Sequence, residues 1–517
     1  MRLWSDACRG IDLNRRRPAA TGVGQYDQSP SSPTCAWEET VAQTLVYASR
    51  ETIRRRNVSC ERYSISGFPT ISRMHSPPDR RTASPAAQGG TPTSSSQPAR
   101  SWAADLGPGL ASLGCDNDPS GIATYSLAGA WYGYDMLWTC VLSYPSMVAL
   151  QLVSARVAAV TGHGLTANMR AHYSPVFFYF AVARFVIANT LNIAVNVMAM
   201  AAVIQRFTHG PLWLLALACG CTSIALQWFI PYARYAQVLK WLMLPMFAYV
   251  GVLLIVDVPW HTVVLRSLVP HVEWKEDFVT MLMAVLGTTM SPYLLFSQAE
   301  QEAQEEHRQH EQHAARGDRR SSEQLRRVRK QTLVRTALSS VAALCMMIAA
   351  AATLHVAQTQ PGEPAELSRA LEPLLKGYAG PLLGLALIGS ALLALPSLAG
   401  SAAQAVASSF DWPRGKQRDR RIAALLVALA GFGTLLGLAL GLWHVDPVKA
   451  LYWSAVVNGM TITPVLVLLV LLSAKREAVG ELVAHWSLRA LCWLATLTTG
   501  VVVVAHFVLE VVDRVSR

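Results

Sequence analysis

From Leu106 onward the chain is a succession of apolar runs long enough to cross a lipid bilayer, and this pattern limits the fold more than any other feature. Hydrophobic residues make up 52% of the 517 residues, and charged residues only 15%. A membrane-spanning helix needs about 20 apolar residues, so the sequence predicts about eleven spans. Their approximate bounds are 101–125, 136–160, 176–204, 212–230, 236–256, 278–296, 332–355, 380–407, 422–443, 450–472 and 488–511. We therefore expect an all-α polytopic membrane protein, with residues 101–517 as its transmembrane domain in contact with lipid.

Residues 1–100 have a different composition, rich in Ser, Pro and Arg. Such a segment buries too little apolar surface to fold alone, so we expect a disordered tail. No apolar stretch follows its first basic residues, which argues against a secretory signal. A start at Met74, the other methionine before the first span, is an equally compatible interpretation.

The net charge of +11 is explained by topology rather than by a nucleic-acid partner. Lys and Arg gather in the tail and in alternate loops, at 308–330, 414–421 and 475–476, whereas the loop after the ninth span carries only Lys449. Cytoplasmic loops carry the excess of basic residues. We therefore expect a protein of the cytoplasmic membrane with its N-terminus in the cytoplasm. The nine cysteines include no CxxC pair or zinc spacing, so no disulfide framework is indicated.

The first predicted span is interrupted at 115–121, with the sequence Cys-Asp-Asn-Asp-Pro-Ser-Gly. On insertion scales each Asp costs roughly 2.5–3.5 kcal/mol at the centre of a membrane helix. Pro119 and Gly121 disfavour a continuous helix next to Asp116 and Asp118. A helix broken beside an acid leaves carbonyl and carboxylate oxygens facing a polar cavity, which suits a cation.

The sixth predicted span contains a second break, at 287–293, with the sequence Gly-Thr-Thr-Met-Ser-Pro-Tyr. Either break alone is also what a proline kink in an ordinary helix produces. However, the first and sixth spans hold the same place in two successive groups of five. Paired interruptions of this kind point to an inverted-repeat transporter with its binding site near the middle of the membrane.

At these breaks the chain resembles the Nramp (natural resistance-associated macrophage protein) family of divalent metal transporters. The relevant stretches are 118–126 (DPSGIATYS), 287–296 (GTTMSPYLLF) and 392–404 (LLALPSLAGSAAQ). They are closer to a related branch of the family, with DPSG and SPY in place of DPGN and MPH. The resemblance covers about 106–511 and implies a LeuT-like 5+5 inverted repeat, with a divalent metal cation as substrate.

The resemblance also implies which residues hold the metal. Asp118 would supply the carboxylate, and backbone carbonyls near Cys115 and Thr288 would coordinate from the unwound segments. Asp116 is open to two interpretations. Residues two apart point to different sides of an intact helix, but in an unwound segment both acids can face the cavity. Alternatively, Asp116 lies at the cavity mouth and attracts cations without binding them.

Three positions depart from the family pattern. Gly121 offers no side chain where the family has an amide, Ser291 replaces the thioether, and Tyr293 replaces the histidine linked to proton handling. A site made of oxygens favours Mg²⁺, Ca²⁺ or Mn²⁺ over the softer metals. Two sulfur atoms remain nearby, the thioether of Met290 one position before Ser291 and the thiol of Cys115, which keeps manganese open. The expected cargo is therefore of the Mn²⁺ or Mg²⁺ class.

Proton coupling is expected to be weak or absent. The third span carries Asn189, Asn192 and Asn196 but no carboxylate, and the ninth carries no charge until its ends. With Tyr293 in place of histidine, no side chain near the site titrates near neutral pH. The three asparagines form one polar stripe, which either lines the pathway or joins helices by hydrogen bonds.

Two rival functions share these features. An amino-acid transporter of the same fold would present backbone N–H groups to a substrate carboxylate, which Asp116 and Asp118 would repel. A metal-sensing paralogue that does not transport is the second. An enzyme is not expected, because no Ser/His, Cys/His or HExxH constellation is present at a plausible depth. His307, His310 and His313 indicate either a weak metal trap or a solvated helix face.

Overall fold

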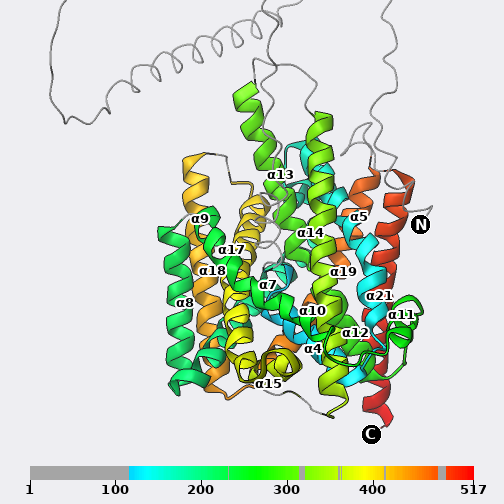
Figure 1. Ribbon diagram of the computed structural model, residues 1–517. Coiled ribbons are helices and arrows are strands. Elements are labelled where there is room, and N and C mark those ends of the chain that lie inside the picture. The colour runs from blue at the N-terminus through cyan, green and yellow to red at the C-terminus, as the bar shows by residue number, and fades with distance from the viewer. Residues whose placement is uncertain are drawn as a thin grey trace, which may run out of the picture. The chain divides into compact units, whose positions relative to one another are not determined.

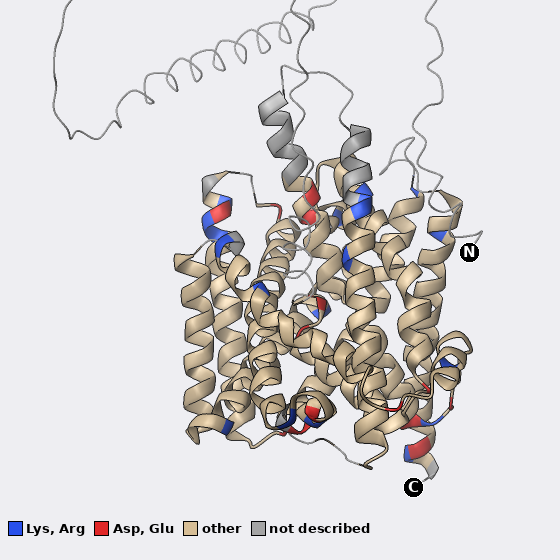
Figure 2. Ribbon diagram, in the orientation of Figure 1, with Lys and Arg blue, Asp and Glu red and all other residues tan. Residues whose placement is uncertain are grey.

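The computed structural model describes residues 114, 116–230, 232–313, 321–358, 361, 364–412, 415–475 and 485–516. Within these ranges every regular element is a helix, and the long helices form one bundle (Figure 1). Figure 2 shows that nearly all the charged residues of this part gather at the two ends of the bundle. The expectation of an all-α membrane protein is confirmed. The tail 1–100 and Cys115 lie outside the described residues.

Nine helical segments of the described chain are long and apolar enough to cross a membrane, and they coincide with nine of the predicted spans. The long helices that form them are α5 (Leu137–Thr161), α7 (Pro175–Thr208), α8 (Leu212–Phe229), α12 (Glu276–Thr289), α13 (Pro292–His313), α14 (Ser321–Ala350), α17 (Ala379–Ser409), α18 (Lys416–Leu442), α19 (Pro447–Ala474) and α21 (Trp486–Ser516). A π-helical turn, Ala351–His355, continues α14. The connecting helices are α6 (Leu165–His172), α11 (Trp260–Leu268), α15 (Pro364–Leu367), η3 (Ser368–Leu371), α16 (Glu372–Leu375) and η4 (Lys376–Tyr378).

The two remaining predicted spans are helical but shorter. The described part of the first span is α4 (Pro119–Tyr132). The fifth is divided into α9 (Tyr232–Leu239), the 3₁₀-helix η1 (Lys240–Phe247) and α10 (Ala248–Val252). Pro245 lies inside η1, where it cannot donate the backbone hydrogen bond of a continuous α-helix.

Both expected helix breaks are present. Helix α4 begins at Pro119 with Asp118 as its N-cap, and α12 and α13 are separated by Met290 and Ser291. One detail of the expectation is wrong, because Gly121 does not break the helix. Gly121 lies in the first turn of α4, where its N–H donates to Asp118. The break instead falls before Pro119, since proline fits the first position of a helix and not its interior.

The packing separates a core from a perimeter. The spanning window of α12 and α13 is 94% buried inside the bundle, whereas those of α8 and α18 are each 22% buried. Helices α8 and α18 pack on each other at one side of the bundle, and α21 lies at the other side against α19 and α5 (Figure 1). The perimeter helices present apolar side chains outward, as a lipid-facing surface requires. The broken helices are therefore held in the middle of the protein.

Helix α12 touches α19 backbone to backbone through a pair of glycines. A Cβ on Gly287 would lie 2.4 Å from the carbonyl oxygen of Ala455, and one on Gly459 would lie 2.3 Å from that of Met283. Neither position has room for a methyl group. This contact fixes α12, which ends at the second break, against α19.

We expect Gly287→Ala to lower stability by about 1–3 kcal/mol, because the added methyl group must push α12 and α19 apart. The measurement is thermal unfolding of purified protein in detergent. Gly431→Ala in α18 is the matched control, since nothing lies within 4 Å of a Cβ built there. Alanine is the better helix former, so the control is expected to melt at the same temperature or higher. Equal melting temperatures for the two variants would contradict the close-contact explanation.

Candidate metal site

The carboxylate of Asp118 is buried, with 4% of the residue exposed, and it accepts four hydrogen bonds. Its Oδ1 accepts from Ser120 Oγ at 2.8 Å and from Gly121 N at 2.9 Å. Its Oδ2 accepts from the amide nitrogens of Asn192 at 3.0 Å and Asn196 at 3.3 Å. One oxygen thus holds the start of α4, and the other faces α7.

Local sequence explains why the acid sits there. Asp is a strong N-cap residue, and proline is favoured at the first helical position that follows. Asp118 has an extended backbone, with φ −66° and ψ 170°, and Pro119 opens the helix. The positive end of the helix dipole also favours a negative charge at this place. The Asp-Pro pair therefore both starts the helix and holds the charge.

The chain just before α4 is tied to two other helices. Ser390 of α17 donates from Oγ to the carbonyl oxygens of Gly114 at 3.1 Å and Asn117 at 2.6 Å. The side-chain amide of Asn117 donates to Ser339 Oγ of α14 at 2.9 Å. These bonds satisfy carbonyls that the helix break leaves without an intrahelical partner.

The opposite break is closed by a serine. Ser291 Oγ donates to the carbonyl oxygens of Gly287 at 3.0 Å and Thr288 at 2.8 Å. The hydroxyl of Thr288 turns back onto its own helix, donating to Ala284 O and Val285 O. The Thr288 carbonyl, an expected metal ligand, therefore already accepts a hydrogen bond. Ser291 can still offer a lone pair of its oxygen to an ion.

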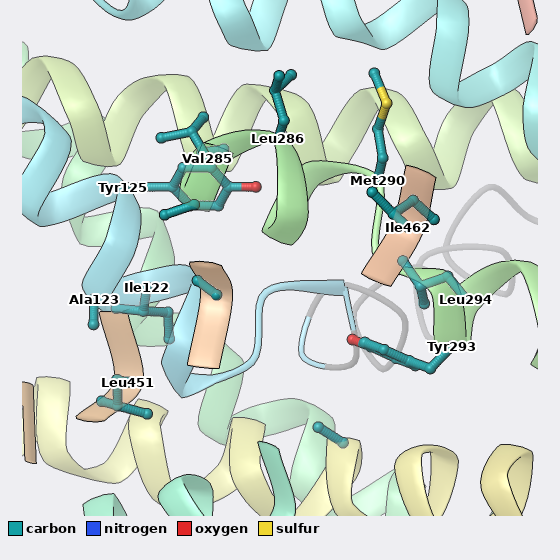
Figure 3. Packing of buried hydrophobic residues seen from close by; sticks show 14 of the residues in the cluster. Ile122, Ala123, Tyr125, Val285, Leu286, Met290, Tyr293, Leu294, Leu451 and Ile462 are labelled. Atoms are coloured by element: carbon teal, nitrogen blue, oxygen red, sulfur yellow. The ribbon is translucent and has the colours of Figure 1, made fainter. Parts of the chain in front are cut away.

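Tyr293 and Met290 leave the second break in opposite directions. In Figure 3 the hydroxyl of Tyr293 is turned toward the chain that enters α4, whereas the thioether of Met290 extends away from it. Both side chains are buried. The hydroxyl of Tyr125 in α4 lies 3.2 Å from Thr289 Oγ1 and joins the two broken helices. Cys115, the other expected sulfur-bearing residue, lies outside the described residues.

Asp116 belongs to a different set of contacts from Asp118. Its Oδ2 forms an ion pair with Arg335 Nε of α14 at 3.3 Å. Arg335 also donates to Gln151 Oε1 of α5 at 3.1 Å, and Thr336 donates to the same oxygen at 3.3 Å. The two acids are thus directed at different helices, Asp116 at α14 and Asp118 at α7.

A small cavity lies beside the Asp116 contacts. Its volume is about 20 Å³, enough for one water molecule or one bare ion. It is lined by Asp116, Tyr125, Cys140, Met147, Gln151, Thr288, Thr289, Leu294, Thr336, Ser339, Ser340 and Ala343. Since α4, α5, α12, α13 and α14 all contribute, the cavity lies where both broken helices meet.

Sequence reasoning missed Arg335 and Gln151. The signal for Arg335 was present, because an arginine inside the apolar run 332–355 is rare and calls for a partner. The sequence left two interpretations open for the asparagine stripe of α7, and the three asparagines have different partners in the structure. Asn192 and Asn196 contact Asp118, whereas Asn189 donates to Leu398 O and Ser401 Oγ of α17.

A second group of potential ligands joins Asp135, from the loop between α4 and α5, to His271 and Glu273, which precede α12. Basic neighbours compensate both acids. Arg266 pairs with Asp135 at 3.2 Å, and Lys275 pairs with Glu273 at 2.8 Å. The hydrogen bond and charge of Lys275, together with His271, hold the pKa of Glu273 below its usual value. This group is accounted for as a surface ion-pair network.

Comparison with known proteins identifies the family. A family model described as Nramp, natural resistance-associated macrophage protein-like, matches residues 110–509. The chain belongs to the Nramp family. Nramp proteins are membrane transporters, so the expectation that the chain is not an enzyme is confirmed, and it is a multi-pass membrane protein.

Its relatives include bacterial divalent metal cation transporters named MntH. The one from Burkholderia ambifaria is 25% identical over 395 residues, which cover 75% of this chain and 84% of that protein. The one from Klebsiella pneumoniae (strain 342) is 26% identical over 388 residues, which cover 73% of this chain and 87% of that protein.

Solved structures show the fold. A manganese transporter from Eremococcus coleocola superposes with a TM-score of 0.59 at 17% identity, covering 78% of this chain and 86% of that one. MhsT in complex with L-phenylalanine superposes with a TM-score of 0.54 at 14% identity, covering 78% and 99%. The LeuT-like fold that the family resemblance implied is confirmed.

We expect removal of either partner of the Asp116–Arg335 pair to destabilise the protein by about 3–5 kcal/mol, because the other charge stays buried and unpaired. Asp116→Asn and Arg335→Gln test this singly in unfolding experiments in detergent. The double variant is expected to recover most of the loss. Arg514→Gln, which removes a pair with Glu510 at the surface, is the control and should cost under about 1 kcal/mol. Additive losses in the double variant would show that the two side chains are not coupled.

Proposed function

We propose that this chain is a secondary transporter that carries divalent metal cations across the cytoplasmic membrane by alternating access. The observation that carries the proposal is the buried carboxylate of Asp118 at one of two paired helix breaks. A dication is the natural partner of such a charge inside a membrane bundle, where the other buried acid, Asp116, is already paired with Arg335. The relatives named as divalent metal cation transporters support the same substrate class.

The donor atoms near the breaks favour a hard cation. Asp118 brings a carboxylate, Asn192 and Asn196 bring amides, and Ser291 brings a hydroxyl. Met290 is directed away from the chain that enters α4 (Figure 3). Oxygen ligands suit Mg²⁺ and Mn²⁺, whereas thioether and thiolate ligands select softer metals. We therefore infer a cargo of the Mg²⁺ or Mn²⁺ class.

Transport is inferred to be uncoupled from protons, or only weakly coupled. The side chains that contact Asp118 in the described structure are amides and a hydroxyl, which do not titrate near neutral pH. The second charged group, Asp116, is paired with Arg335. No chain of titratable groups therefore leads from Asp118 along α7.

The rival amino-acid substrate is disfavoured by the start of α4. In that class the backbone N–H groups at the helix break bind the substrate carboxylate. Here the N–H of Gly121 already donates to the carboxylate of Asp118. A substrate carboxylate would have to approach a negative charge that it cannot displace.

The basic loops give the orientation. Basic residues at 416–421 lie at the start of α18 and Lys475 follows the end of α19, and the segment between α13 and α14 is rich in Arg. Basic loops stay in the cytoplasm. We infer that these ends of the helices, and with them the N-terminus, are cytoplasmic.

We expect Asp118→Asn to reduce Mn²⁺ and Mg²⁺ influx at least tenfold in liposomes loaded with a divalent-sensitive dye. Asparagine keeps the N-cap of α4 through its oxygen. It removes the charge and places an NH₂ group where Oδ2 accepts from Asn192 and Asn196. Asp446→Asn is the matched control, because Asp446 is also an N-cap followed by proline and accepts from Val448 N and Lys449 N. The control is expected to transport at the wild-type rate. Influx through Asp118→Asn at the wild-type rate would refute the assigned site. Wild-type protein that binds metal without moving it would favour the sensor instead.

A pH-sensitive dye inside the same liposomes tests coupling. Under an inward Mn²⁺ gradient we expect influx without acidification of the lumen, because the described side chains that hydrogen-bond to Asp118 do not titrate near neutral pH. A proton ionophore control shows that the dye responds. Acidification that rises in step with Mn²⁺ entry and disappears with Asp118→Asn would contradict uncoupled transport.

A further inference from the structure

The amide groups of α7 stand where a cation at Asp118 needs further oxygen ligands. Mg²⁺ and Mn²⁺ sites use several oxygens, and one carboxylate supplies two at most. Gly121 contributes no side chain, and a Cβ built there would meet Asp118 Oδ1 only at 3.5 Å. The side chains that reach Asp118 Oδ2 are those of Asn192 and Asn196, which are 1% and 0% exposed.

Both asparagines at present offer the wrong end to a cation. Their NH₂ groups donate to Asp118 Oδ2, which is the favourable arrangement when only a carboxylate is there. A side-chain amide carries an oxygen on its other end, so a half-turn about its last bond exchanges donor for acceptor. The same two residues can therefore hold the carboxylate without metal and coordinate a metal beside it.

The surroundings of Asn192 permit this half-turn. Ser454 Oγ of α19 donates to Asn192 Oδ1 at 3.3 Å. A hydroxyl both donates and accepts, so Ser454 can accept from the NH₂ group once the amide has turned. Ser454 is therefore a hydrogen-bond partner of the Asn192 amide in both orientations.

Asn196 supplies an independent observation. Its Oδ1 is fully buried and has no hydrogen-bond partner. A buried polar atom of this kind in a folded protein calls for a specific cause, such as an ion that binds there. Asn189 Oδ1 is likewise buried without a partner among the described residues, so the unpaired oxygen points to a cation only at Asn196, whose amide also reaches Asp118.

We propose that Asn192 and Asn196 are metal ligands that exchange amide N–H for amide oxygen when the cation binds at Asp118. The inference deepens the proposed function and rests on it, because it names the selectivity-determining ligands of the same site. It assigns to α7 a direct part in binding, whereas Asn189, one turn away on the same stripe, only joins α7 to α17.

Two substitutions at Asn192 separate a ligand from a simple hydrogen-bond donor. Asn192→Ala removes both ends of the amide. Asn192→Asp keeps an oxygen ligand, and because its carboxyl group shares a buried site with Asp118 it holds a proton that it can donate to Asp118 when no metal is bound. A ligand role predicts that the Asp variant retains metal binding and the Ala variant loses it. A donor role predicts that the Asp variant binds metal and keeps its proton, whereas a ligand role predicts that the proton is released on binding, which makes the binding enthalpy depend on the buffer.

The experiment is calorimetric titration of full-length protein in detergent with MnCl₂ and, separately, MgCl₂. We expect Asn192→Ala to weaken binding about tenfold or more, which is the range that even supporting groups around a metal produce. We expect Asn192→Asp to bind within a few-fold of wild type or more tightly. Asn189→Ala is the matched control and should bind as wild type does. Thermal unfolding without metal confirms that each variant is folded.

Asn196→Ala and Asn196→Asp repeat the test should the Asn192 variants not fold. Equal weakening by the Ala and Asp variants, or the same loss in Asn189→Ala, would overturn the ligand assignment while wild-type binding upheld the proposed function. Wild-type protein that binds neither metal would overturn the proposed function itself.

Discussion

The burial of one carboxylate at a helix start is the interaction on which the centre of this protein depends. An isolated charge inside a bilayer costs several kcal/mol, so its surroundings must supply donors. Asp118 receives them from its own helix, α4, and from α7. The buried charge therefore needs the helix break for its hydrogen-bond donors, and Pro119 favours a helix start at the same place. An unbroken helix would leave no free N–H groups to point at the acid.

At the second break, neutral side chains rather than a carboxylate satisfy the free backbone groups. Ser291 returns hydrogen bonds to the carbonyls that the end of α12 leaves free, and Ser390 of α17 does so for the chain before α4. Irregular backbone is tolerated at membrane depth only where protein or a polar cavity covers it. The heavily buried α12 and α13 meet that condition, and the glycine contact with α19 keeps α12 in place. Alternating access would have to exchange these hydrogen bonds rather than simply break them.

Much of this architecture was readable from the sequence. Nine spans, both breaks and the family follow from apolar run length, from Pro119 and Pro292, and from motifs that lie close together in the chain. The pairings were not readable, because Asp118 and Asn192 lie 74 residues apart and Asp116 meets Arg335 from a distant helix. Such contacts depend on how helices pack, which hydropathy does not encode. The misplaced role of Gly121 has a similar origin, since the sequence shows a weak helix former but not which side of the proline the helix begins.

The pairing of Asp116 bears on how a cargo would leave. With Arg335 bound to Asp116, these two charges cancel, and Asp118 contributes a single negative charge among amides and hydroxyls. A dication held by one carboxylate and neutral oxygens is bound less tightly than one held by two carboxylates. Passage through a membrane requires binding strong enough to admit an ion and weak enough to release it. Arg335 thus does more than satisfy a buried acid. Because Arg335 neutralises Asp116, the proposed site has one free carboxylate, and its affinity for a dication stays low enough for release.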